Sequence, residues 1–251
     1  MNFITNTLSR AAHTASPLLP VLAGRWSPRG FYPTALVDEA TLTTVLEAAR
    51  WAPSASNMQP ARFIVARRGS DSFAKIHETL MGFNKASADA ASVLIVNVAT
   101  LPIDVTRENP WARYDLGQAV AHLTIQAQHE GLHTHQLGGF DGTALALAFG
   151  LAEDQATVSI TALGVLGDVS LLSPELLERE SAPRTRKPLI ELLLVNDWST
   201  TSQQPAARAR PDTVTPQPRQ VRTELNYFSR QRARLLPAVN TGGDHDDRTH
   251  P

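Results

Sequence analysis

The chain has 251 residues, of which 42% are hydrophobic, so it can bury a sizeable core without disulfide or metal cross-links. Its 23 basic and 24 acidic residues leave a formal net charge of -1, which gives no overall attraction to nucleic acid or anionic lipid. The absence of cysteine excludes disulfides, thiolate nucleophiles and cysteine-ligated metal centres. No apolar run approaches the roughly 20 residues that span a bilayer. We therefore expect a cytoplasmic protein with neither a membrane nor a nucleic-acid partner.

Residues 1–24 are predicted to form an N-terminal arm, with a short helix over residues 3–8, where apolar residues have helical spacing. Pro17 and Pro20 interrupt the apolar region that a secretory signal would need, so export is not expected.

Helices and strands follow between residues 38 and 99. A plausible N-cap at Asp38 and apolar residues at three- and four-residue steps predict a helix that ends before Pro53. A short strand, an amphipathic helix and a nearly continuous apolar strand are predicted next, over residues 62–67, 70–83 and 93–99.

A long helix is predicted over residues 114–130, where apolar residues line one side and Gly131 stands at a C-cap position. Strands return over residues 133–137 and 158–166, with a small helix over 142–150 between them. Because helices and strands do not alternate in regular βαβ units, the pattern favours an α+β sandwich over a doubly wound fold.

The composition changes after Trp198. The last 53 residues hold six of the 17 prolines and show little apolar periodicity, which predicts a largely extended or disordered tail over residues 199–251. Within it, residues 225–236 mix aromatic and leucine side chains with arginines. That segment is compatible with a helix that docks on this or a partner subunit, or with a weak basic interaction motif.

A polar segment lies between Pro53 and Pro60, after an apolar helix and before an apolar strand. Proline disfavours helical geometry at the preceding residue, so the segment is predicted to be an ordered turn. It offers hydrogen-bonding groups to a planar polar ligand through Ser54, Ser56, Asn57 and Gln59. The alternative is a helix stop that is rich in small polar residues.

Two arginine pairs bracket the predicted core, Arg25 with Arg29 and Arg184 with Arg186. The planar guanidinium suits bidentate phosphate binding, and the hydroxyl of Ser27 adds a donor between the first two. Each pair alone is also compatible with a solvated basic turn. Both pairs would serve one phosphate if the first and last elements of the core met.

Two further patterns were weighed. The paired glycines Gly138 and Gly139 suit close approach of a ligand ring as well as a plain turn. The cluster of His129, His133 and His135 has no acidic or cysteine partner nearby, so structural hydrogen bonding is favoured over a metal site and no metal is predicted. The chain contains no Gly-x-Ser-x-Gly, Walker or Gly-x-Gly-x-x-Gly motif.

Taken together, five segments resemble the flavin-dependent nitroreductase family: RWSPR at 25–29, LEAARWAPSASNMQP at 46–60, FN at 83–84, LGGFD at 137–141 and PRTRKP at 183–188. The match covers about residues 25–198, which divides the chain into an arm over 1–24, a domain over 25–198 and the tail over 199–251.

The resemblance implies a homodimeric α+β fold, a three-layer α/β/α sandwich with a mixed, mainly antiparallel sheet and FMN at the subunit interface. It implies that the FMN phosphate and ribityl end are held by Arg25, Trp26, Ser27, Arg29, Arg184 and Arg186. Pro53, Ser54 and Asn57 would reach the flavin of the partner subunit, Asn84 and Gln59 the isoalloxazine edge, and a backbone N–H of Gly138 or Gly139 the flavin N5.

By the same resemblance, NADPH or NADH reduces FMN, and a nitroaromatic, quinone or activated alkene then accepts the electrons. Such chemistry takes place on the flavin, so no side chain is named as catalytic. Ala61 and Ser87 depart from residues common in the family near the acceptor pocket. Two alternatives stay open: a flavin oxidase or dehydrogenase that desaturates a small biosynthetic intermediate, and a non-catalytic protein that binds flavin or a partner.

Overall fold

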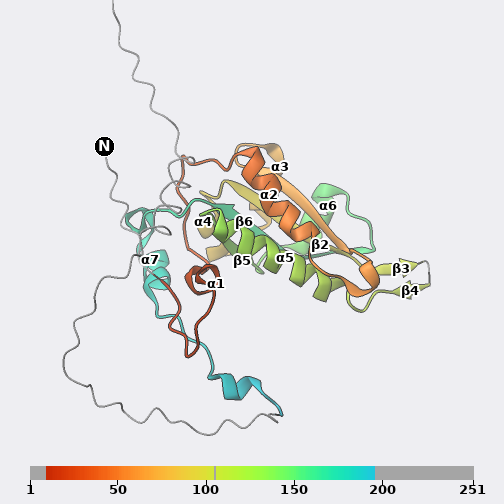
Figure 1. Ribbon diagram of the computed structural model, residues 1–251. Helices are drawn as coiled ribbons and strands as arrows, with labels where there is room; N and C mark the ends of the chain where they lie inside the picture. The colour runs from red at the N-terminus through yellow and green to blue at the C-terminus, as the bar shows by residue number, and fades with distance from the viewer. Residues whose placement is uncertain (1–9, 105, 196–251) are drawn as a thin grey trace, which may run out of the picture.

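The computed structural model describes residues 10–104 and 106–195. One sheet has the strand order β1-β2-β6-β5, and a short hairpin, β3-β4, extends beyond it (Figure 1). The strands are β1 Ala61–Arg67, β2 Val93–Thr100, β3 Pro102–Asp104, β4 Arg107–Glu108, β5 His133–Leu137 and β6 Gln155–Gly164.

All three pairings within the four-stranded sheet are antiparallel, whereas the family resemblance implied a mixed, mainly antiparallel sheet. The reason lies in the connections. Arg67, which ends β1, pairs with Val93, which begins β2, so the helices between them leave and re-enter the sheet at the same end. A chain that returns at the same end must run in the opposite direction.

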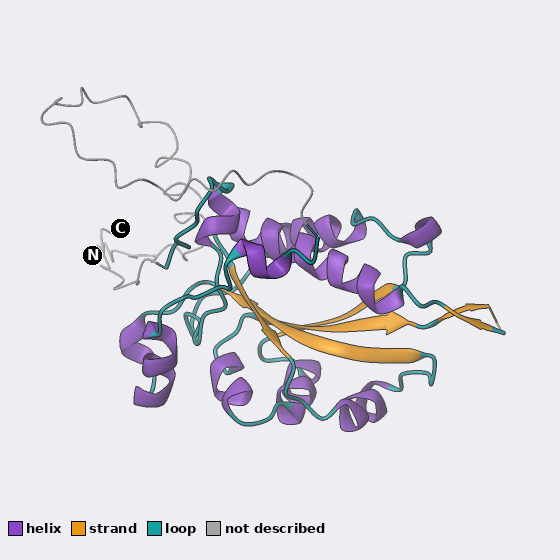
Figure 2. Ribbon diagram, turned by 90° about the horizontal axis from the view of Figure 1, so that it is seen from below, coloured by secondary structure: helices purple, strands orange, loops and turns teal. Residues whose placement is uncertain are grey.

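The core has two parts because β2 is buried on both faces. Val93 and Ile95 pack with the apolar sides of α2 Glu39–Arg50 and α5 Ala112–His129. The alternate residues Leu94 and Val96 pack with α3 Asp71–Thr79 and α6 Gly142–Phe149. Side chains alternate between the two faces of a strand, so helices cover both faces of the sheet (Figure 2).

The helix ends follow local capping chemistry. The Asp38 side chain accepts a hydrogen bond from the Thr41 N–H at 2.8 Å, which confirms the predicted start of α2. Asp141 caps α6 in the same way through the Ala144 N–H at 2.9 Å. Gly131, at φ 77°, follows the end of α5.

The helix predicted over residues 70–83 is present as α3, but it ends at Thr79 and not at Phe83. A second helix, α4 Phe83–Ala88, begins after Gly82, which has φ 53° and ψ -133°. The apolar periodicity runs on through this point, but a glycine in a conformation that L-residues rarely adopt turns the chain into a new helix.

Several elements were not predicted, namely α1 Pro20–Gly24, α7 Pro174–Ser181 and the 3-10 turns Ala55–Asn57, Val169–Leu171 and Leu189–Leu192. The hairpin was not predicted either, and β6 starts earlier than expected. The helix predicted over residues 3–8 and the tail segment 225–236 lie outside the described residues. No helix in the described ranges is long and apolar enough to cross a membrane.

Gly82→Ala should lower the free energy of unfolding by about 1–3 kcal/mol, because the substitution forces an L-residue into this backbone conformation. An added Cβ would meet no atom within 4 Å, so backbone strain alone is tested. The control is Gly117→Ala in the exposed interior of α5, where alanine should stabilise the helix by about 0.5–1 kcal/mol. Urea unfolding of both variants measures the difference, and equal stabilities would contradict the assignment.

Candidate functional site

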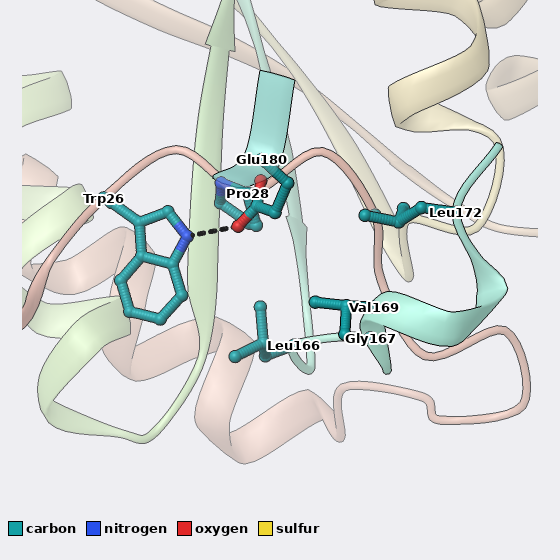
Figure 3. Close-up of a pocket in the computed structure, with 8 residues that line it drawn as sticks. Trp26, Pro28, Leu166, Gly167, Val169, Leu172 and Glu180 are labelled. Atoms are coloured by element: carbon teal, nitrogen blue, oxygen red, sulfur yellow. Dashed lines mark hydrogen bonds between the residues drawn. The ribbon is translucent and has the colours of Figure 1, made fainter. Parts of the chain in front are cut away.

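The 25–29 segment is held against α7 by a single carboxylate. The Trp26 indole N–H donates to Oε1 of Glu180 at 2.8 Å, and the backbone N–H of Arg29 donates to Oε2 at 2.8 Å. Figure 3 shows Trp26 and Glu180 at a small pocket between the segment and the chain that follows β6. The ring of Trp26 also packs edge-on against His133, with centroids 4.6 Å apart.

Arg184 joins three parts of the chain. Its guanidinium donates to the carbonyl oxygens of Arg10, Ala23 and Arg25, the last at 2.8 Å. The three acceptors belong to the described start of the chain, to α1 and to the 25–29 segment. Arg184 therefore brings the first and last parts of the described chain together. The prediction that both arginine pairs serve one phosphate depends on such a contact.

Four arginines, Arg10, Arg25, Arg184 and Arg186, lie close enough to influence one another. Burial and the guanidinium of Arg186 lower the pKa of Arg25. Burial and the guanidiniums of Arg25, Arg186 and Arg10 lower the pKa of Arg184. Both shifts have the sign expected for positive charges that repel each other in a partly desolvated setting.

None of the four arginines forms an ion pair with a residue in the described part of the chain. The salt bridges found in the described ranges are Arg50 with Glu47, His77 with Asp89 and Arg107 with Asp104. In that part of the chain the side chain of Arg25 donates no hydrogen bond, and Arg186 donates only to the carbonyl of its neighbour Thr185. Arg10, Arg25 and Arg184 are partly buried and Arg186 is exposed. Such a cluster of positive charge with free planar donors is suited to an anion.

Arg29 has a different partner. Its guanidinium Nη1 lies 3.0 Å from Nε2 of His135. Because a guanidinium only donates, Nε2 must accept, and the imidazole is assigned the neutral form with its proton on Nδ1. Burial and the Arg29 charge lower the pKa of His135 to about 4. The structure thus joins Arg29 to β5, and Ser27 lies beside it with its carbonyl 3.5 Å from the same Nη1.

The polar segment between Pro53 and Pro60 is a strained turn. Ser56, Asn57 and Gln59 all have positive φ, between 49° and 55°, although none is glycine. Non-glycine residues in this region cost free energy and need support from their surroundings. Part of the support comes from Ser54, whose hydroxyl accepts from the Gln59 N–H at 3.0 Å.

The rest of the support comes from α5. The buried side chain of Asp115 accepts from the Ala55 N–H at 3.1 Å. Pro53, Asn57 and Gln59 stay exposed, and Gln59 folds back so that its side-chain amide donates to the Asn57 carbonyl at 3.2 Å. The turn therefore presents polar groups on the surface from a fixed backbone.

Asn84 and the paired glycines form a third group. The Asn84 side-chain amide donates to the Gly139 carbonyl at 3.1 Å. A Cβ added at Gly139 would come within 2.7 Å of that amide nitrogen, so glycine is required for the contact. Gly138 next to it is exposed.

The arginine cluster and the turn between Pro53 and Pro60 lie at opposite ends of the sheet. The turn precedes Ala61, which pairs with Ala99, whereas Trp26 packs on His133, which pairs with Gly164 at the other end. Figure 1 shows the same separation, with α1 and α7 at one end and the β3-β4 hairpin at the other. One chain brings Arg25, Arg184 and Arg186 together but does not bring the turn to them.

Three residues that shape these groups were not identified from sequence: Arg10, Asp115 and Glu180. Each is an isolated charged residue, and its role depends on a partner that lies 60 or more positions away in the chain. The three histidines weighed as a metal site form no metal-binding group in the described ranges. His133 packs on Trp26 and His135 contacts Arg29.

One family model and several known proteins match this chain. The model of the nitroreductase family matches residues 22–100. An uncharacterized 15.4 kDa protein of Mycolicibacterium smegmatis is 38% identical over 144 residues, which cover 55% of this chain and 97% of that protein. YdgI of Bacillus subtilis strain 168, to which NAD(P)H nitroreductase activity is ascribed, is 25% identical and covers 60% of this chain and 88% of its own.

A solved structure extends the likeness over more of the chain. An oxidoreductase that contains FMN is 32% identical, with a TM-score of 0.69, and the superposition covers 79% of this chain and 99% of that one.

The contact between Arg29 and His135 predicts a pH dependence of stability. The pKa of His135 is about 4 in the fold and near 6.5 in the unfolded chain, so the unfolded chain binds more protons between these values. The contribution of the neutral His135 to the free energy of unfolding should therefore be fully present above pH 6.5. It should decrease as the pH drops toward 4, by up to about 3 kcal/mol in total.

The measurement compares urea unfolding of the wild type and of His135→Gln from pH 7 to pH 4. Glutamine retains a hydrogen-bond acceptor but does not titrate, so the difference between the two free energies should shrink as the pH falls. A constant difference would show that His135 is not held neutral.

Proposed function

Because the chain belongs to the nitroreductase family, we propose that it is an FMN-dependent oxidoreductase. NADPH or NADH is the electron donor, and a nitroaromatic, a quinone or an activated alkene is the acceptor. The observation that carries the proposal is the cluster of four guanidinium groups that, within residues 10–104 and 106–195, has no acidic partner. The FMN of the 32% identical oxidoreductase and the activity ascribed to YdgI support the cofactor and the reductant.

The cluster fits a phosphate group. A phosphate monoester carries close to two negative charges at neutral pH and offers three acceptor oxygens. Arg25 and Arg186 hold it in this proposal, because their guanidiniums are not committed to distant carbonyls. Arg184 supports them by fixing the surrounding backbone, and Trp26, Ser27 and Arg29 line the ribityl end.

Asn84, Gln59 and the two glycines serve the flavin ring in this proposal. The required glycine at 139 leaves room beside the Asn84 amide, and a backbone N–H of Gly138 or Gly139 is available to the flavin N5. When bound, FMN supplies hydride transfer between the nicotinamide and the acceptor. The protein contributes fixed dipoles and exclusion of water, which need no side-chain nucleophile.

The separation of the groups supports a homodimer. The turn that carries Pro53, Ser54 and Asn57 lies at the end of the sheet away from the arginine cluster of the same chain. A second copy in the opposite orientation would bring its turn to the first copy's cluster. Each flavin then lies at the subunit interface and takes contacts from both copies.

Removal of the two uncommitted arginines tests the phosphate assignment. Arg25→Ala combined with Arg186→Ala should raise the Kd for FMN by about 100-fold or more, since a hydrogen bond to a charged group contributes about 1.5–3 kcal/mol. Flavin fluorescence titration measures the affinity. Arg107→Ala, on the β3-β4 hairpin, removes the same group far from the cluster and should leave the Kd unchanged. Unaltered affinity in the double variant would contradict the assignment.

The direction of electron flow is tested with the flavin-loaded protein. Anaerobic NADPH or NADH should bleach the flavin absorbance, and a nitroaromatic or a quinone should restore it. Bound flavin that neither nicotinamide reduces would replace this proposal with an oxidase or dehydrogenase. Failure of the purified chain to take up FMN would overturn both.

A further inference from the structure

We propose that Glu180 is a positioning residue that sets the 25–29 segment for phosphate binding, and that α7 fixes this segment relative to Asn84. The proposal deepens the proposed function and rests on it, because the role that it assigns concerns flavin binding. Glu180 itself lies behind the segment and is not assigned a contact with the ligand.

The geometry of the carboxylate carries the argument. Glu180 is only 4% exposed, and its two oxygens accept from two different points of the segment, the Trp26 indole and the Arg29 backbone N–H. Between these points lies Pro28, whose ring fixes one backbone torsion and which has no N–H of its own. Two hydrogen bonds of 2.8 Å at either end of a stiffened stretch leave Arg25 and Arg29 little freedom to move.

The burial of Glu180 lowers the stability of the fold, which points to a role other than stability. Burial of a carboxylate carries a large desolvation cost, and the two groups that donate to Glu180 are uncharged N–H groups. No cation offsets its charge in the described part of the chain, although several arginines are near in sequence. Because Glu180 accepts from the indole N–H and not from the guanidiniums of the arginine cluster, those guanidiniums stay available to a ligand.

The neighbouring residue of α7 reaches the other part of the site. The guanidinium of Arg179 lies 3.8 Å from the ring centroid of Phe83, the residue before Asn84. A cation over an aromatic face is attracted by the ring quadrupole, and the contact fixes the start of α4. Consecutive side chains of one helix thus contact the phosphate end and the flavin-ring end of the proposed site.

The end of α7 is fixed as well. Ala182, just after the helix, accepts from the Arg10 guanidinium at 2.7 Å, and Arg184 follows two positions later. The C-terminal part of the helix is therefore held through Glu180 and Ala182, and Glu180 lines the pocket shown in Figure 3. A rigid support of this kind is what a preorganised anion site needs.

The test replaces Glu180 with Gln in the full chain. The amide keeps the size of the side chain, but its NH₂ group faces one of the two N–H donors, so one hydrogen bond is lost. The Kd for FMN should rise about tenfold, as expected for loss of one hydrogen bond to a charged group. Hydrogen exchange of the Arg29 backbone amide, measured without flavin, should become faster at the same time.

Glu178→Gln is the matched control, because it makes the same change on the exposed side of α7 and should leave both readouts at the wild-type values. Trp26→Phe provides a second route, since it removes one donor and keeps the aromatic ring. If Glu180 acts through that donor, the Trp26→Phe and Glu180→Gln effects on the Kd should not add.

The outcomes separate the two proposals. Failure of the wild-type chain to take up FMN would overturn the proposed function. Uptake by the wild type, with the same Kd and the same Arg29 exchange in Glu180→Gln, would overturn the positioning role. A lower unfolding midpoint with an unchanged Kd would also overturn it, because a residue that serves stability alone predicts that result.

Discussion

The burial of β2 on both faces is the constraint on which the rest of this structure depends. Alternate residues such as Ile95 and Val96 must each find apolar cover, so helices pack on both sides of the sheet. The polar groups assigned to the proposed ligand site lie outside these two faces. They gather at the ends and edges of the sheet, where α7, the turn before β1 and the glycines after β5 lie.

The polar groups at the ends of the sheet lower the stability of the isolated chain. Positive charges repel one another around Arg25 and Arg184, and non-glycine residues adopt positive φ in the turn. Glu180 is buried, and no cation within residues 10–104 and 106–195 pairs with it. Each feature lowers stability unless something compensates for it. An anionic ligand would relieve the repulsion, and a second copy of the chain would give the turn a binding partner. The same pattern underlies both the proposed cofactor and the proposed dimer.

Different residues fix the backbone of the proposed site at the two ends of the sheet. At the end with the arginine cluster, carbonyl and carboxylate oxygens of distant segments accept from Arg184 and Trp26. At the other end, Asp115 on the long helix α5 accepts from the backbone of the turn. In both places a residue away from the expected ligand fixes the backbone that carries the binding groups. Such support can hold a cofactor without a side-chain catalyst.

The sequence by itself determined the elements with strong local signals and the types of residue in the site. Capping at Asp38, the apolar run of β2 and the polar turn between two prolines could be recognised because their signals are local. Only the tertiary structure decided which distant residues meet. The split at Gly82, the pairing of Arg29 with His135 and the role of Glu180 depend on backbone torsions and on contacts over long stretches of chain, which periodicity does not encode.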